Sequence, residues 1–379
     1  MKVAANTILI ICLLALLASC STTLSVVDKG RLADRLPQVL EGFVLSDLPA
    51  REMPGWRKPE RILVTLASMG ITDGLEQELE GIDVYKVPGF AFKEVPSGPF
   101  DVILSMCSVP SNLRAIKNTH WVHSYSVGIE GCLANPKIKN SDDLLLTNSR
   151  GASASTIAEH AIALMFSLGR NLPLYQRNML EQHWASNGAL PRENFWSFEG
   201  KTVLVLGLGS IGREAAQRAH GLGMRVIATR NSRREGPNYV DYVGLSHEAL
   251  ALAAQADVVI NALPFTPATQ NLVDAEFFQA MPTDALFINV GRGGTVDTAA
   301  LVSALENNII GGAGLDVVNP EPLPKTSPLW GFKNVIITPH VAAMSNKSLQ
   351  LTRLIAQENL RRYIAGDRLI NFVNRENAY

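Results

Sequence analysis

The sequence predicts an α/β protein built from two doubly wound, parallel-sheet domains with a cleft between them. Two successive blocks of short apolar segments alternate with helical stretches, and a glycine-rich turn joins a strand to a helix in the second block. The length of 379 residues also suggests two domains. Hydrophobic residues make up 47% of the chain and charged residues 18%, which is enough apolar mass for two cores. The net charge of -1 gives no general electrostatic case for nucleic acid or an anionic membrane surface.

The first block begins at Arg61 and contains five short, mostly apolar segments. Strands of this kind are typical of parallel sheets that are buried on both faces. We expect strands at 62–67, 83–87, 101–106, 121–126 and 144–149.

The second block begins after a long helix, which the apolar spacing predicts over 155–171. Its predicted strands are 202–207, 225–229, 258–263, 285–290, 312–317 and 335–340. Its predicted helices lie near 211–222, 247–254, 275–280 and 298–307, and a last helical stretch covers 345–365.

The first twenty residues have the layout of a secretory signal peptide: Lys2, an apolar run from Ile8 to Leu17, and the ending Leu17-Ala18-Ser19-Cys20. That ending resembles a bacterial lipobox, in which Cys20 would be acylated and become the mature N-terminus. An uncleaved hydrophobic stub or a mis-assigned start codon would give a similar pattern. We expect residues 21–60 to form an extension, a tether with a short helix around 28–36.

The remaining cysteines are Cys12, inside the leader, and Cys107 and Cys132. Two cysteines do not make a disulfide framework in a chain of this length, so we predict buried free thiols. We expect no metal site, since the seven histidines are scattered and no CxxC or HExxH spacing occurs.

The turn Gly207-Leu208-Gly209-Ser210-Ile211-Gly212 follows a predicted strand and opens a helix. In this context GxGxxG predicts a dinucleotide site. Gly207 permits the tight turn, Gly209 lets the backbone approach a pyrophosphate, and Gly212 lets helix and strand pack closely. The alternative is a tight turn in a flavodoxin-like protein that binds no dinucleotide.

The end of the second strand of this unit normally carries an acid that bonds the adenosine ribose of NAD. Here it carries Arg230, followed by Arg233 and Arg234. A guanidinium binds a 2′-phosphate with charge-assisted bonds, so these arginines favour NADP over NAD as cofactor. A solvated basic loop is the alternative, and arginine here does not exclude NAD.

Three side chains follow strand ends in the second block: Arg292, Glu321 and His340. Active groups of open α/β sheets gather at the carboxyl ends of the strands, so we expect them in one cleft. A histidine supplies a proton near neutral pH, a carboxylate favours its protonated form, and an arginine holds a substrate carboxylate. Taken singly, each residue also fits a role without catalytic function. Arg292 could belong to a surface ion pair, Glu321 could be a solvated charge, and His340 could cap a strand.

The stretches GLGSIG, ALPFTPAT, INVGRGGTVD, GLDVVNPEPLP and ITPHVA occur in this order over about residues 60–370. Together they resemble the D-isomer-specific 2-hydroxyacid dehydrogenases, and most of all the glyoxylate/hydroxypyruvate reductase and phosphoglycerate dehydrogenase branches. The resemblance implies hydride transfer between NAD(P) and a small 2-keto or 2-hydroxy acid. His340 would be the acid/base, Glu321 its partner, and Arg292 would bind the substrate.

The resemblance also implies further contacts and an architecture. The loop SVGIE would hold the substrate carboxylate through Val127 and Gly128. Besides the glycines and Arg230, the implied cofactor contacts are Ser210, Ile211, Leu263, Pro264, Val290, Gly291, Asp316 and Ala342. A substrate domain would comprise 61–150 and 338–379, a nucleotide domain 151–337, and the helix over 155–170 would form a homodimer.

Two alternatives remain open at this point. A cofactor-sensing binding protein on the same scaffold is the second candidate; formate dehydrogenase is disfavoured because that relative pairs its histidine with glutamine. The signal indicates a membrane-anchored lipoprotein, with a tether at Cys20, whereas the family and its cofactor indicate the cytoplasm.

Overall fold

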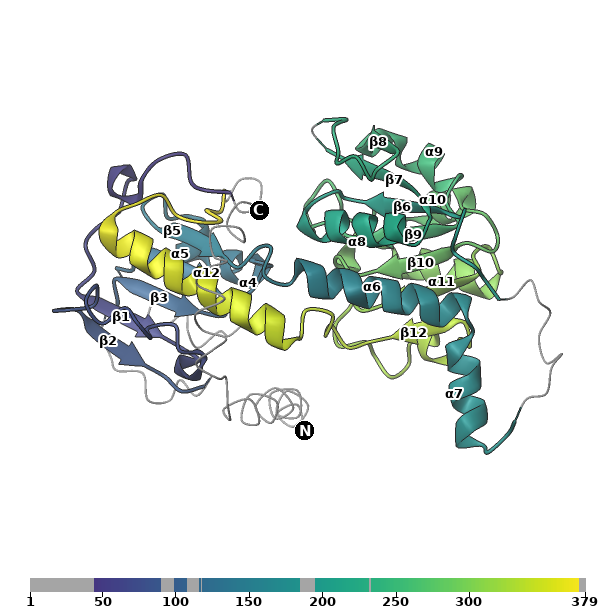
Figure 1. Ribbon diagram of the computed structural model, residues 1–379, viewed down its shortest axis with the longest axis horizontal. Coiled ribbons are helices and arrows are strands. Elements are labelled where there is room, and N and C mark those ends of the chain that lie inside the picture. Colours follow the sequence, from purple (N-terminus) through teal and green to yellow (C-terminus); the bar gives the residue numbers. More distant parts are fainter. Residues whose placement is uncertain are drawn as a thin grey trace. The chain divides into compact units, whose positions relative to one another are not determined.

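The structure is a computed structural model and describes residues 44–89, 99–107, 116, 118–184, 195–231 and 233–374. The predicted signal peptide, Cys20 and the short helix expected around 28–36 lie outside these residues. The chain divides into two compact units (Figure 1). The first unit comprises Met1–Ala152 with Leu349–Tyr379, and the second comprises Ser153–Ser348.

The first unit contains a five-stranded, fully parallel sheet in the order β2-β1-β3-β4-β5. Its strands are β1 (Arg61–Val64), β2 (Asp83–Lys86), β3 (Val102–Ser105), β4 (Trp121–Ser124) and β5 (Leu145–Asn148). Its helical elements are η1 (Ala50–Glu52), η2 (Ala67–Met69), α4 (Glu130–Leu133), α5 (Pro136–Lys139) and most of α12 (Asn346–Ala365). Each of the five predicted strands is present.

Alternating side chains of these strands enter two cores, because successive residues of a strand point to opposite faces. Ile62 and Val64 pack with Tyr363 of α12, while Leu63 packs on the other face with Ile138 of α5. Figure 1 shows α12 lying along one face of this sheet. Both faces are therefore covered, which explains the nearly continuous apolar runs in the sequence.

The described part of the predicted extension, from Val44 onward, belongs to this unit. Ser46 exchanges backbone and side-chain hydrogen bonds with Leu369, and Ala50 is fully buried. Cys107 and Cys132 form a disulfide, so the prediction of free thiols is wrong. Both cysteines are buried, and spacing alone did not reveal that the fold of the sheet brings them together.

The second unit contains a seven-stranded parallel sheet in the order β12-β11-β10-β9-β6-β7-β8. Its strands are β6 (Thr202–Leu206), β7 (Arg225–Arg230), β8 (Tyr242–Leu245), β9 (Val258–Asn261), β10 (Leu286–Asn289), β11 (Gly312–Leu315) and β12 (Val335–Ile337). Its α-helices are α6 (Ala154–Gly169), α7 (Leu172–Leu180), α8 (Ser210–Gly221), α9 (Ala249–Ala253), α10 (Ala275–Ala280) and α11 (Thr298–Glu306). Short helical turns are η6 (Ser246–Glu248), η7 (Gly293–Thr295) and η8 (Pro328–Gly331).

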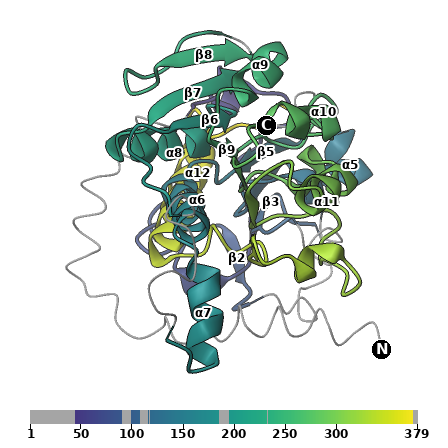
Figure 2. The same cartoon turned by 90° about the vertical axis from the view of Figure 1, so that its right-hand side faces the viewer.

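Helices cover both faces of this sheet, which is the doubly wound arrangement that the sequence predicts. Val203 and Val205 of β6 enter a core with α6 and α8, whereas Leu204 and Leu206 enter a core with α9, α10 and α11. Figure 2 shows α6 and α8 on one side of the strands and α10 and α11 on the other.

Helix α6 buries the apolar face that its spacing predicts, with Ile157, Ala161 and Leu164 among the core residues. This face packs inside the second unit. Several exposed apolar side chains lie just beyond it, on and after α7: Leu172, Met179, Leu180 and Trp184 are all at least half exposed.

The compact units divide after Ala152 and after Ser348, while the sequence places the domain crossings near 150 and 338. His340 therefore belongs to the same unit as the glycine turn, Arg292 and Glu321. Among the described residues, no helix has the length and apolar content needed to cross a membrane.

Candidate active site

The parallel register of the second sheet brings the segments after its strands to one edge. Leu206 of β6 pairs with Thr229 of β7 and Asn261 of β9, and the same level continues across β10, β11 and β12. Arg230 is the last residue of β7. The other candidates follow their strand ends within three residues: the glycine turn, Leu263, Gly291, Asp316 and His340. The second unit therefore gathers at one edge the candidates that were far apart in sequence.

The three glycines of the turn have different surroundings. Gly207 adopts φ +87°, a left-handed conformation that favours glycine. A Cβ at Gly212 would collide with the carbonyl oxygen of Gly207 and lie 3.0 Å from Val205 Cγ1, so this glycine permits close packing of α8 on β6. Gly209 has open space where its Cβ would lie, at the start of α8. A pyrophosphate fits this arrangement, since the N-terminus of α8 begins at Ser210 and Ile211.

The arginines after β7 differ in their partners. Arg234 is bonded to Glu248 at 2.6 Å and to the Tyr242 hydroxyl at 3.0 Å, so it holds η6 and β8 together. Arg230 donates to the backbone carbonyl of Glu235 at 2.9 Å, and Arg233 lies 3.9 Å from the Glu235 carboxylate. The structure thus separates a structural arginine, Arg234, from the two that remain candidates for phosphate binding.

Arg213 is a basic residue of this site that the sequence analysis did not single out. It lies in the first turn of α8, and its charge, together with that of Arg233, lowers the pKa of Arg230 after the larger effect of burial. The charges of Arg213 and Arg233 therefore both act on the guanidinium of Arg230 near the end of β7. Such a cluster is stabilised when a dianionic phosphate lies between its members.

Leu263, Pro264, Val290 and Gly291 lie on adjacent strand ends. A Cβ at Gly291 would come within 2.7 Å of the carbonyl oxygen of Leu263, so glycine is required where these two loops meet. Val290 is buried and donates to the carbonyl of Asn261 at 3.1 Å, while Pro264 is exposed.

Arg292 follows β10 and begins the turn η7. Its Nη1 donates to the backbone carbonyl of Gly291 at 2.8 Å. Its own carbonyl accepts from the Thr295 hydroxyl at 2.7 Å. Its charge influences the pKa values of both His340 and Glu321, which places the guanidinium in the neighbourhood of that pair.

Glu321 and His340 form a direct pair. Nδ1 of His340 lies 2.8 Å from Oε2 of Glu321, and Oε1 of Glu321 accepts from the backbone N–H of Val318 at 3.1 Å. The pKa of His340 is raised, chiefly by the hydrogen bond that its Nδ1–H donates to Glu321; burial and Arg292 oppose the shift, and the charges of Glu321 and Asp316 support it.

The pKa of Glu321 is lowered. Burial is the largest single influence and acts in the opposite direction. The hydrogen bond and charge of His340, the Val318 N–H and Arg292 together outweigh it. The pair therefore favours an imidazolium beside a carboxylate, which is the protonation state of a histidine ready to donate a proton.

Asp316 holds the loop that carries His340. Its carboxylate, only 3% exposed, accepts from the Thr338 hydroxyl at 2.6 Å, the Val341 N–H at 2.9 Å and the Ala342 N–H at 3.1 Å. The N–H of His340 donates to the carbonyl of Asp316 at 2.8 Å. These bonds fix His340 at φ +55°, a conformation that costs a non-glycine residue on the order of 1 kcal/mol.

Val127 and Gly128 lie in the first unit, between β4 and α4, and are half-buried. The carbonyl of Val127 accepts from the Asn148 side chain at 2.8 Å. The amides of both residues donate no hydrogen bond to another residue that the structure describes. In the described ranges, no group of three or more His, Cys, Asp or Glu side chains is arranged to hold a metal ion.

These features define a two-unit α/β protein with a dinucleotide-binding turn and an Arg, Glu and His set, which is the architecture of a nicotinamide-dependent dehydrogenase. Residues 162–342 match the family model described as D-isomer specific 2-hydroxyacid dehydrogenase, NAD binding domain. The chain belongs to the D-isomer specific 2-hydroxyacid dehydrogenase family.

Individual relatives agree with this assignment. A glycerate dehydrogenase of Methylorubrum extorquens is 33% identical over 59% of this chain and 69% of its own length. A glyoxylate reductase of Korarchaeum cryptofilum is 30% identical over 73% of this chain and 83% of its own. The crystal structure of a D-isomer specific 2-hydroxyacid dehydrogenase from Xanthobacter autotrophicus Py2 in complex with NADPH and MES is similar with a TM-score of 0.70 and 28% identity, covering 84% of this chain and 99% of that one.

Proposed function

We propose that the chain is a 2-keto acid reductase that uses NADP in preference to NAD and acts on a small substrate such as glyoxylate or hydroxypyruvate. The observation that carries the proposal is the Glu321–His340 pair, 2.8 Å apart, at the same sheet edge as the glycine turn and Arg292. The names of the relatives, glycerate dehydrogenase and glyoxylate reductase, support this substrate class.

His340 is the proton donor in the proposed reduction. Because Nδ1 is engaged by Glu321, the proton that the ring gains and releases is the one on Nε2. Negative charge develops on the carbonyl oxygen of a keto acid as its carbon is reduced, and the imidazolium neutralises it by donating that proton. In the reverse direction the neutral ring accepts the hydroxyl proton of the 2-hydroxy acid.

Arg292 is proposed to bind the substrate. A guanidinium forms two parallel bonds to a carboxylate, or one to a carboxylate and one to the adjacent carbonyl. The bond from Nη1 to the Gly291 carbonyl restricts the orientation of the side chain. The amides of Val127 and Gly128 are proposed to bind the same carboxylate, as the resemblance implies.

The residues of the second unit fit a nicotinamide dinucleotide, which when bound supplies a hydride to the carbonyl carbon. Gly209 and the N-terminus of α8 would hold its pyrophosphate, because the open space at Gly209 lies beside the first N–H groups of this helix. Arg230, with Arg213 and Arg233, would hold a 2′-phosphate. This cluster, and the NADPH named for the similar Xanthobacter protein, support NADP.

The test is a panel of keto acids assayed with NADPH and NADH by loss of the reduced-nicotinamide absorbance. Oxidation of NADPH with glyoxylate or hydroxypyruvate is expected, and His340→Ala should lower turnover roughly a hundredfold or more. His247→Ala is the matched control, because His247 is an exposed histidine on η6. Full binding of NADPH without turnover of any keto acid would favour a cofactor-sensing protein instead.

We also propose a homodimer. The helix over residues 155–170 buries its apolar face within its own unit, so the surface offered to a second copy includes α7 with Leu172, Met179 and Leu180. Sedimentation measurements test this proposal. The wild type should have the mass of a dimer and Met179→Lys should dissociate toward the monomer, whereas a wild type with the mass of a monomer would overturn the proposal.

Finally, we propose that the chain is exported and anchored through an acylated Cys20. The disulfide between Cys107 and Cys132 supports this location, because such bonds persist in oxidising compartments and are rare in the cytosol. Metabolic labelling with a fatty-acid analogue tests the anchor, and an unlabelled product would end the proposal.

A further inference from the structure

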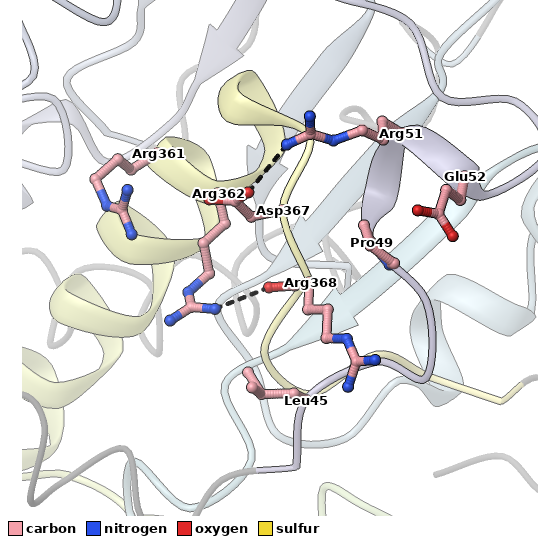
Figure 3. A pocket seen from close by; sticks show the side chains of 8 residues that line it. All are labelled: Leu45, Pro49, Arg51, Glu52, Arg361, Arg362, Asp367 and Arg368. Carbon is pink, nitrogen blue, oxygen red and sulfur yellow. Dashed lines mark hydrogen bonds and ion pairs between the residues drawn. The ribbon is translucent and has the colours of Figure 1, made fainter.

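The first unit contains a cavity of about 430 Å³ between the segment around η1 and the end of α12 (Figure 3). Its charged side chains are largely paired. Arg51 lies 3.1 Å from Asp367, which is 316 positions further along the chain, and Arg361 and Arg362 share the carboxylate of Glu358. These pairs stabilise the fold of the first unit. A polar side chain without such a structural explanation lies in the second unit, beside the candidate active site.

This side chain is that of His160, which lies on α6 and is 25% exposed. The buried residues of α6 are alanine, isoleucine, leucine, methionine and glycine. Placing a polar ring beside such residues costs free energy unless the ring is hydrogen-bonded. Nε2 of His160 lies 2.9 Å from the hydroxyl oxygen of Thr338 and 3.6 Å from Oδ1 of Asp316. The ring therefore contacts the strand ends that hold His340.

The direction of each hydrogen bond follows from the protons that are available. The Thr338 hydroxyl lies 2.6 Å from Oδ1 of Asp316, and the same carboxylate accepts the backbone N–H groups of Val341 and Ala342. An ionised carboxylate has no proton to donate, so the single hydroxyl proton of Thr338 points to Asp316. The Thr338 oxygen is then an acceptor, and Nε2 of His160 carries the proton between them. The bonds therefore run from His160 to Thr338 and on to Asp316.

Close packing of α6 on the sheet brings His160 within reach of Thr338. Gly314 of β11 has no side chain, and a Cβ there would lie 2.9 Å from Cβ of Leu164. Leu164 lies one helical turn after His160, on the same face of α6. A larger residue in place of Gly314 would push the helix away from β11, whose neighbour β12 leads into Thr338. The bond from His160 therefore comes from a helix that is packed firmly against the sheet.

The loop of residues 338–345, called the His340 loop below, is bonded to α6 at both ends. Thr156 precedes His160 by one helical turn, so both side chains lie on one face of the helix. The Thr156 hydroxyl lies 2.9 Å from the hydroxyl of Ser345, at the end of the loop. His160 bonds Thr338 at its beginning. The loop that holds His340 at positive φ is therefore fixed against a packed helix, and such a conformation persists only where surrounding bonds determine it.

We propose that His160 is a positioning residue for His340 in the proposed reduction. Its Nε2–H keeps the Thr338 hydroxyl turned toward Asp316, and the carbonyl of Asp316 accepts the backbone N–H of His340. The proposal rests on the proposed function, in which His340 donates the proton. Without the bond from His160 the Thr338 hydroxyl can rotate and the loop loses a fixed contact. The imidazole of His340 then spends less time in the orientation that proton transfer needs.

The test compares variants that separate the hydrogen bond from the bulk of the ring. His160→Leu removes the donor and keeps an apolar side chain. His160→Gln supplies an amide N–H in place of Nε2–H. Thr338→Val removes the hydroxyl through which His160 acts, with little change of shape. Glu159→Gln is the matched control on the same helix, since Glu159 is exposed and bonds Ser155 and Arg218.

The first measurement is steady-state reduction of a keto acid with NADPH. His160→Leu should lower kcat about fivefold, which is about 1 kcal/mol at 1.4 kcal/mol per tenfold and the usual contribution of one hydrogen bond. KM and the Kd for NADPH should not change, because other residues bind the substrate and the cofactor. His160→Gln should restore kcat, and Glu159→Gln should leave it unchanged. Combining His160→Leu with Thr338→Val should lower kcat no further than Thr338→Val alone, because His160 acts through that hydroxyl.

The second measurement is backbone hydrogen exchange in the peptide that covers the His340 loop, and it needs no turnover. Exchange should be faster in His160→Leu than in the wild type, because the N–H groups of Val341 and Ala342 are protected by their bonds to Asp316. His160→Gln should exchange as the wild type does. A peptide that covers β6 should exchange equally in all variants.

The two measurements separate this proposal from the proposed function. Equal exchange of the His340 loop in His160→Leu and in the wild type would overturn the positioning role, whatever the activity. A wild-type kcat in His160→Leu, or a kcat that His160→Gln does not restore, would overturn it as well. If the wild type reduces no keto acid, the proposed function is overturned. Faster exchange in His160→Leu that His160→Gln reverses would then still support the contact by which His160 holds the loop.

Discussion

Replacing Glu321 by glutamine removes the negative charge beside the His340 imidazole and leaves an amide oxygen that still accepts a hydrogen bond. The carboxylate raises the pKa of His340 through the bond at 2.8 Å and through its charge. In Glu321→Gln the pKa of His340 should therefore fall. Reduction needs the protonated ring, so the loss of reductase activity with rising pH should begin at a lower pH.

The magnitude follows from the geometry of the pair. Opposite charges ~4 Å apart attract by about 1 kcal/mol in water and by about 4 kcal/mol at an effective dielectric constant of 20. The side chains are 47% and 38% exposed, so the lower figure is the appropriate one. At a pH above the pKa, a loss of about 1 kcal/mol lowers the protonated fraction of His340 about fivefold.

The assay is a pH profile of kcat/KM in both directions. Oxidation of the hydroxy acid needs the neutral ring, so its activity should appear at a lower pH in Glu321→Gln than in the wild type. Glu306→Gln, at an exposed glutamate of the same unit, should leave both profiles unchanged. Profiles that drop equally at every pH in Glu321→Gln would show that the carboxylate only positions the ring, and the proton-affinity argument would be refuted.

The glycine turn and the arginine cluster yield three further predictions. Arg230→Asp should shift the ratio of kcat/KM values from NADPH toward NADH. Arg234→Ala should leave that ratio unchanged, because Arg234 is bonded to Glu248 and Tyr242. An unchanged ratio in Arg230→Asp would show that Arg230 is not part of the cofactor site. Gly212→Ala should lower the free energy of unfolding by about 1–3 kcal/mol, because its Cβ would collide with Gly207. Gly209→Ala should keep the melting temperature and weaken NADPH binding, since open space surrounds that Cβ; equal melting temperatures for the two variants would contradict the packing role of Gly212.

Much of the fold follows from hydrophobic patterning, because the strands are buried on both faces. The segments after Arg61 and Lys201 contain continuous apolar runs, and eleven of the twelve observed strands coincide with predicted ones. The missed strand, β8 (Tyr242–Leu245), lies at the edge of its sheet, has an exposed tyrosine and contains a glycine. Edge position weakens the apolar pattern, so periodicity alone does not reveal such a strand.

The candidate site shows a similar division between what sequence predicts and what it does not. Sequence identifies the arginines after β7 as a group, but only the fold shows that Arg234 is bonded to Glu248 and that Arg213, from a helix, joins Arg230. Likewise, the pairing of Cys107 with Cys132 depends on tertiary folding, and no local pattern encodes it. Contacts between separate elements are the information that a linear motif lacks.

Asp316 has a different role in the structure from the one that its sequence suggests. The resemblance assigns it to the cofactor, whereas the structure surrounds its carboxylate with three hydrogen-bond donors of the His340 loop. Asparagine offers one acceptor oxygen in place of two, so Asp316→Asn leaves a buried N–H or hydroxyl unsatisfied, at a cost of about 1–3 kcal/mol. The loop that holds His340 at positive φ should then loosen. We expect kcat and the melting temperature to fall while the Kd for NADPH changes little, whereas Asp284→Asn, at an exposed position, should change none of them. A positioning residue acts through the loop that it holds, so its loss should lower the melting temperature. A large rise in the Kd for NADPH with an unchanged melting temperature would instead show that Asp316 is a direct cofactor ligand.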